Sequence, residues 1–166
     1  AGKSSLLNAL TNAQAKVGNY EFTTLDPNLG DFYGKIIADI PGLIEGASQG
    51  KGLGTKFLKH IKRTKMLAHL VSLENEKPMT VYKQIRKELG TYDKLLLEKD
   101  EVIVLTKTDM ISDAKKIEKV KKEFSALGRS PAGREKKPIA VLTLSLYDDA
   151  SIKAFMKELA KLLKNK

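Results

Sequence analysis

Short apolar runs alternate along this chain with longer segments in which apolar residues recur at helical spacing. The runs cover residues 36–40, 68–73, 102–105 and 141–145, and their continuous Val, Ile and Leu content predicts buried strands. Residues 79–89 and 151–163 have helical periodicity, and Leu6, Leu7 and Leu10 share one face of a shorter helix. This alternation predicts an α/β fold with a doubly wound, mostly parallel sheet, which places a ligand at the carboxyl edge of the strands.

The polar start of the chain matches the end of a phosphate-binding loop. Its residues are Ala1, Gly2, Lys3, Ser4 and Ser5, which fit the last part of the pattern G-x-x-x-x-G-K-[ST]. Such a loop directs backbone N–H groups and a helix N-terminus at phosphate oxygens. Lys3 would bridge the β- and γ-phosphates, and the Ser4 hydroxyl would ligate Mg²⁺. On its own, the triplet reads equally well as a helix start capped by serine.

The first glycine of that pattern, and the strand that precedes it, are not in the sequence. In a mononucleotide-binding α/β domain this strand lies inside the sheet. We therefore expect residues to precede Ala1, and this domain to lack its first strand.

Two further motifs suit the γ-phosphate and its metal ion. Residues 17–30 are predicted to be a switch segment, in which Thr24 would place its hydroxyl on Mg²⁺ and its N–H on the γ-phosphate, with Thr23 as the alternative.

Asp39 follows an apolar run and would hold Mg²⁺ through water. Gly42 would bring its N–H against the γ-phosphate. An ordinary strand-end turn would also explain Asp-Ile-Pro-Gly. The glycines of residues 42–54 predict a second switch.

Two strand ends suit the guanine base. The run 102–105 ends in Thr106, Lys107, Thr108 and Asp109. A carboxylate at Asp109 would accept the ring N–H and the exocyclic amine of guanine side by side, a pair of donors that adenine lacks. The stem of Lys107 would cover the base plane, and Thr106 would tie this loop to the phosphate loop. The last run ends in Ser145, Leu146 and Tyr147, whose backbone would donate to the guanine carbonyl; Ser145 is equally a helix-entry signal.

The chain resembles the GTPase domain of the Obg family. The residues that carry the resemblance are NYEFTTLDPNLG (19–30), ADIPGLIEGA (38–47), GKGLG (50–54) and FLKHI (57–61). It implies that residues 1–166 form one GTP-binding domain of the P-loop NTPase, Ras-like type that lacks its first strand. It also implies a Mg²⁺-dependent GTPase that acts in ribosome assembly, chiefly on the large subunit, and in growth or stress control. The nucleotide site that it implies adds Phe22, Leu25, Asp26, Ile40 and Pro41 to the residues above, with Lys3, Thr24 and Gly42 as the catalytic ones and Ser4, Thr24 and Asp39 on the metal.

The sequence departs from the family pattern in three places. The sequence does not contain the family's glycine-rich domain, the connection between Gly30 and Ile36 is short for the usual hairpin, and Ser145-Leu146 replaces the commoner Ser-Ala.

Leu43 follows Gly42 at a position where Ras-type GTPases place a glutamine that orients the attacking water. Leucine has no group for that task, and a hydrophobic plug is its simplest role. We expect slow hydrolysis unless another switch group, a monovalent cation or the ribosome positions the water. The alternative function is a nucleotide-gated module that binds RNA or the ribosome and hydrolyses GTP only incidentally.

Positive charge is concentrated in the later part of the chain. Residues 1–54 hold four lysines and five acids, so nearly all of the 30 basic residues and the whole net charge of +10 belong to the rest. Two basic groups stand out: Lys56, Lys59, Lys62, Arg63 and Lys65, and then Lys115, Lys116, Lys119, Lys121 and Lys122. Such charge favours a ribosomal particle or rRNA as partner, although a solvated surface is also an ordinary explanation. Because aromatic residues are few, RNA contacts would be to backbone and shape, without DNA specificity.

The remaining composition adds little chemistry. The chain has no cysteine and no apolar stretch long enough to span a bilayer, so we expect a cytoplasmic monomer without membrane insertion. His60 and His69 have no second ligand at zinc spacing, and His69 is predicted to be a hydrogen-bonded core or edge residue.

Overall fold

The computed structural model describes residues 3–11, 29–38, 64–92, 94–128 and 139–164. They group into two compact units, which are treated separately below. One contains Lys65–Lys83 and Glu98–Lys166, and the other contains Gly2–Thr64 and Gln84–Leu97.

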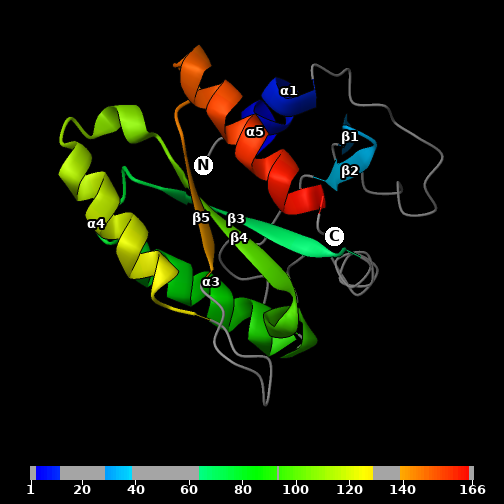
Figure 1. Cartoon of the computed structure of the whole chain (residues 1–166). Helices are drawn as coiled ribbons and strands as arrows, with labels where there is room; N and C mark the ends of the chain where they lie inside the picture. The colour runs from blue at the N-terminus through cyan, green and yellow to red at the C-terminus, as the bar shows by residue number, and fades with distance from the viewer. Residues whose placement is uncertain (1–2, 12–28, 39–63, 93, 129–138, 165–166) are drawn as a thin grey trace. The chain divides into compact units, whose positions relative to one another are not determined.

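The first unit is built on a parallel sheet of three strands, in the order β3-β4-β5 (Figure 1). These strands are β3 (Met66–Ser72), β4 (Asp100–Thr106) and β5 (Ala140–Leu144). Parallel pairing of the two neighbours with β4 confirms the predicted α/β class. In this unit β4 is buried from Val102 to Leu105, each fully inaccessible to solvent, as its continuous apolar run predicts.

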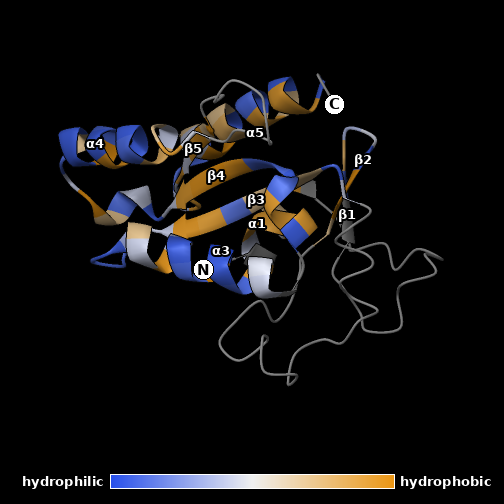
Figure 2. Ribbon diagram, turned by 90° about the horizontal axis from the view of Figure 1, so that it is seen from below, coloured by the Kyte–Doolittle hydropathy of each residue, from blue (hydrophilic) through white to orange (hydrophobic). Residues whose placement is uncertain are grey.

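Helices cover this sheet. They are α4 (Ala114–Ser125), α5 (Asp149–Lys164) and the first part of α3 (Pro78–Tyr92). Ile103 and Leu105 of β4 lie in one apolar cluster with Tyr82 of α3 and Phe124 of α4. Figure 2 shows β4 as largely hydrophobic and α4 as largely hydrophilic, which fits a central strand and a surface helix. In α5, Phe155 and Leu159 are buried, as the helical spacing predicts.

A buried polar cluster joins β3, α3 and β4. Glu101 accepts a hydrogen bond from the Tyr82 hydroxyl at 3.2 Å, and its other oxygen lies 3.1 Å from Nδ1 of His69. The side chains of His69 and Glu101 are 9% and 1% exposed. The expectation that His69 is a hydrogen-bonded residue of the sheet is therefore confirmed, and the buried carboxylate has the partners that its burial requires.

The second unit contains α1 (Lys3–Thr11), an antiparallel pair of strands, the second part of α3 and a short 3₁₀ helix, η3 (Lys94–Glu98). Leu6, Leu7 and Leu10 of α1 are buried, which confirms their predicted shared face. The strands are β1 (Leu29–Phe32) and β2 (Lys35–Ala38). Arg86 donates to the carbonyl oxygen of Leu97 at 3.1 Å and so links α3 to η3.

The connection that looked short for a hairpin is a two-residue turn. Tyr33 and Gly34 both have positive φ, at 50° and 80°, which is the geometry of a type I′ turn and matches the twist of paired strands. Residues 29–30 of the predicted switch segment belong to β1. The prediction of a buried strand over residues 36–40 is wrong for Ile36, which is 50% exposed on an antiparallel strand. Asp39 and Ile40 lie outside the described residues.

The core of the first unit can be tested through the free energy of unfolding. Phe124→Ala removes a fully buried ring from the cluster of α3, α4 and the sheet, and should lower the free energy of unfolding by about 3–5 kcal/mol. The neighbouring exposed Glu123→Ala is the matched control, and should change it by no more than about 0.5 kcal/mol. Urea unfolding followed by circular dichroism measures both, and equal midpoints for the two variants would contradict this placement of the core.

Candidate functional site

The three parallel strands of the first unit end at the same level. In the strand register Ser72, Thr106 and Leu144 are neighbours across the sheet, and each is the last residue of its strand. The loops that begin at Leu73, Lys107 and Ser145 therefore leave one edge of the sheet together. This is the carboxyl edge, where open α/β sheets bind ligands.

The loop after β4 reverses sharply to present Asp109. Lys107 adopts the left-handed conformation, with φ 60° and ψ 42°, immediately before the 3₁₀ turn η4 (Thr108–Met110). Backbone N–H groups of Met110 and Ile111 donate to the carbonyl oxygens of Lys107 and Thr108, at 3.1 and 3.2 Å, and close the turn. A non-glycine residue in this conformation is uncommon and tends to occur at functional sites. The reversal leaves Asp109 exposed at the sheet edge.

Ser145 ties the loop after β5 to Asp109. Its hydroxyl donates to Oδ1 of Asp109 at 2.8 Å and accepts from the N–H of Tyr147 at 3.4 Å. Its own N–H donates to the hydroxyl oxygen of Ser151 in α5, at 2.9 Å. Ser145 is only 3% exposed, so a single buried residue sets the position of the carboxylate and of the loop beside it.

The arrangement leaves a matched set of free groups on these loops. Within the described residues, Oδ2 of Asp109 accepts no hydrogen bond and the N–H of Leu146 donates none. Of the three predicted N–H donors, those of Ser145 and Tyr147 are engaged, so Leu146 is the one available to a base carbonyl. A carboxylate with a free acceptor and a neighbouring N–H complement the edge of guanine.

Asp148, and not Ser145, caps the beginning of helix α5. Asp148 performs that role, because its side chain accepts from the N–H of Ala150 at 3.0 Å and its carbonyl oxygen accepts from Ile152 at 3.1 Å. Ser145 remains available to Asp109. Tyr147 is 92% exposed.

Lys107 holds the remainder of the loop after β4, and Thr106 leaves a buried hydroxyl at its start. The Lys107 ammonium pairs with the carboxylate of Glu74, which follows β3. Thr106 is 5% exposed, and its hydroxyl oxygen is buried without a hydrogen-bond partner in the described part of the chain. That hydroxyl is therefore free for a group beyond the described residues, which is compatible with the predicted role of Thr106.

Sequence reasoning missed Glu74 and Ser151. Glu74 stands two residues beyond the end of β3, and this position at the carboxyl edge was the available signal. Ser151 lies on the first turn of α5 and meets Ser145 only through the fold.

The phosphate and metal half of the predicted site is largely beyond the described residues. Lys3 and Ser4 open helix α1, as predicted, and Ser5 in its first turn is exposed. The predicted residues that lie outside are Ala1, Gly2, Phe22, Thr23, Thr24, Leu25, Asp26, Asp39, Ile40, Pro41 and Gly42.

Comparison with known proteins gives consistent matches. Residues 1–108 match the family described as 50S ribosome-binding GTPase. The chain is 49% identical over 156 residues to the GTPase Obg of Pelagibacter ubique, covering 92% of this chain and 45% of that protein. It is 49% identical over 136 residues to the GTPase Obg of Persephonella marina, with 77% and 40% covered, and 44% identical over 151 residues to that of Leuconostoc citreum, with 86% and 34% covered. The chain thus spans less than half the length of these relatives.

Loss of the hydrogen bond between Ser145 and Asp109 should weaken guanine-nucleotide binding measurably. Ser145→Ala removes the hydroxyl that holds Asp109, and should weaken guanosine diphosphate binding by about 1 kcal/mol, or roughly fivefold. Ser145→Thr, which keeps a hydroxyl, should restore part of the loss. Titration of fluorescent guanosine diphosphate measures both.

The matched control is Ser125→Ala, which removes a half-buried hydroxyl at the end of α4, away from the loops that begin at the sheet edge. It should leave binding unchanged. If Ser145→Ala bound as tightly as the parent, the Asp109 carboxylate would not depend on Ser145.

Proposed function

The chain belongs to the family of 50S ribosome-binding GTPases, with the Obg GTPases among its relatives, and on that premise we propose that residues 1–166 form one GTP-binding domain that hydrolyses GTP to GDP and phosphate. The observation that carries the base-binding part of this proposal is the Asp109–Ser145 hydrogen bond at the level ends of β4 and β5. It holds a carboxylate beside the free N–H of Leu146, which together complement guanine and not adenine.

The phosphate-binding part rests on the sequence. Lys3 and Ser4 open α1, so backbone N–H groups and the positive end of the helix dipole accompany the lysine charge. Catalysis in this proposal is electrostatic: Lys3 and backbone N–H groups, with Gly42 and Thr24 among their sources, stabilise negative charge on the phosphates as the bond to the leaving diphosphate breaks. No covalent nucleophile on the protein is needed.

Magnesium fits the donor set that this chain offers. Ser4, Thr24 and Asp39 provide hydroxyl and carboxylate oxygens, the ligands that Mg²⁺ prefers. When bound, the ion would neutralise charge on the β- and γ-phosphates.

We propose further that GTP binding switches the association of this protein with a ribosomal particle in the cytoplasm, in the assembly of the large subunit. The family description and the excess of basic residues after residue 54 support this partner. None of the described helices is long and apolar enough to cross a bilayer. Leu43 favours a second candidate, in which the nucleotide only gates RNA or ribosome binding and turnover is incidental.

Asp109→Asn tests the base specificity directly. Asparagine presents an amide in place of one carboxylate oxygen. The affinity of the variant for guanine nucleotides should therefore fall by about two orders of magnitude. Its affinity for xanthine nucleotides should rise, because xanthine carries a carbonyl where guanine has its amine. Titration of the purified protein with labelled GDP, GTP and xanthosine diphosphate, each with Mg²⁺, measures the switch.

Asp113→Asn is the matched control for this switch. Asp113 is another exposed acid four residues along, and it caps α4 by accepting from the N–H of Lys115 at 2.9 Å. Asparagine caps a helix equally well, so this variant should bind as the parent does. If Asp109→Asn and Asp113→Asn behaved alike, Asp109 would not be the base-reading residue.

Steady-state turnover separates the two candidate functions. We expect slow hydrolysis by the protein alone and faster hydrolysis when large ribosomal subunits are added, because a partner that positions water or supplies charge accelerates other GTPases by about 10³–10⁵. Nucleotide-dependent binding to subunits with no acceleration would favour the gated module.

A further inference from the structure

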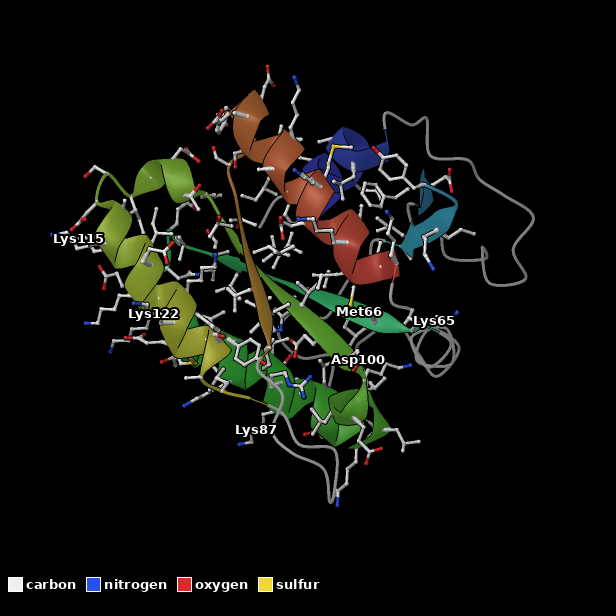
Figure 3. All side chains as sticks on the ribbon, viewed as in Figure 1. Lys65, Met66, Lys87, Asp100, Lys115 and Lys122 are labelled. Atoms are coloured by element: carbon white, nitrogen blue, oxygen red, sulfur yellow. The ribbon has the colours of Figure 1, made fainter. Side chains whose placement is uncertain are left out.

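Helix α4 carries an outward row of lysines, named here the α4 lysine face. It consists of Lys115, Lys116, Lys119 and Lys122, all exposed. The inner side of the same helix is apolar: Phe124 is fully buried, and Ile117 and Val120 pack against the core cluster. In Figure 3, Lys115 and Lys122 lie toward the two ends of α4 on its outer side.

Helical geometry aligns these side chains. Successive residues are about 100° apart, so Lys115, Lys119 and Lys122 fall on one stripe with Lys116 beside it. From Lys115 to Lys122 the stripe is about 10 Å long, because an α-helix rises 1.5 Å per residue. The lysines therefore present a short line of positive charge and no isolated cation.

No acid forms an ion pair with this line within the part of the chain that the structure describes. Lys107 pairs with Glu74 and Lys161 pairs with Glu158, whereas the four lysines of the α4 lysine face have no ion pair or side-chain hydrogen bond there. Glu118 and Glu123 are on the same helix and exposed, yet they pair with none of the four. Like charges at helical spacing repel one another, and a polyanion would relieve that repulsion.

The chemistry of the face points to phosphates in a row. The apolar side of α4 is committed to the core, so the helix has no face left to insert into a lipid surface. The only aromatic residue of α4 is Phe124, which is buried, so the face has no ring on which a base would stack. What remains is a set of ammonium groups that would contact a nucleic-acid backbone and release its counterions.

We propose that the α4 lysine face binds the phosphate backbone of RNA. The choice of RNA rests on the proposed function, because the partner of a ribosome-binding GTPase is made largely of RNA. The contact is independent of base sequence and weakens with salt.

A pair of triple variants tests the proposal. Lys115, Lys119 and Lys122 are changed together to Gln, which removes three charges and keeps helix propensity. The matched control changes Lys153, Lys157 and Lys164 of α5 to Gln, which removes the same charge from exposed positions of another helix. Urea midpoints and GDP affinity of both variants, measured on the same preparations, report folding and the nucleotide site.

The readout is binding to a duplex RNA of twenty base pairs at several potassium chloride concentrations. Each phosphate that a lysine neutralises contributes about 0.7–0.9 to the salt slope of binding. The slope should therefore fall by about 2–3 in the α4 variant and remain unchanged in the α5 variant. Binding of the parent to a DNA duplex of the same sequence should be weaker than to RNA.

Three results would overturn the proposal: no RNA binding by the parent, equal slopes for the α4 variant and the parent, or equal reductions in the two variants. DNA binding as tight as RNA binding would overturn the assignment to RNA. The nucleotide titration distinguishes these failures from failure of the proposed function. The α4 variant should bind GDP as tightly as the parent does. If Asp109→Asn did not switch to xanthine nucleotides, that result would refute the nucleotide site and leave the RNA proposal untouched.

Discussion

The in-register ending of three parallel strands is the constraint on which the rest of the first unit depends. β4 lies between β3 and β5, and the backbone of its buried run from Val102 to Leu105 pairs with those two neighbours. Because Ser72, Thr106 and Leu144 finish at one level, loops from distant parts of the sequence emerge beside one another. The sheet brings Asp109 and Ser145 close together, and the loops after β4 and β5 complete the contact between them.

A few polar groups hold the loops in place, and Lys107 does so in an unfavourable backbone conformation. Lys107 adopts a left-handed conformation that costs a non-glycine residue about 1–2 kcal/mol. The hydrogen bonds that close η4, and the ion pair between Lys107 and Glu74, offset this cost. Ser145 is buried and uses both its hydroxyl and its N–H in hydrogen bonds to other residues. A site built in this way is sensitive to single side chains.

The sequence predicted the parallel sheet and its helices because their signals are periodic. The strands β3, β4 and β5 and the helices α3 and α5 appear within a few residues of their predicted bounds. Ile36 was wrongly placed in a buried strand, since a short apolar run looks the same in an exposed hairpin. The connection between Gly30 and Ile36 looked short for a hairpin, and Tyr33 did not indicate the tight turn because tyrosine is not a turn signal. Glu74 and Ser151 join the site through tertiary contacts, which periodicity does not encode.

The hydrogen bond from Ser145 to Ser151 connects the loops after β4 and β5 to the first turn of α5. Two hydrogen bonds in series thus run from the Asp109 carboxylate, through one serine, to a helix that packs along β5. A ligand that orders the Asp109 carboxylate would therefore also act on the beginning of this helix, and by reciprocity a partner that holds α5 would bias the position of that carboxylate.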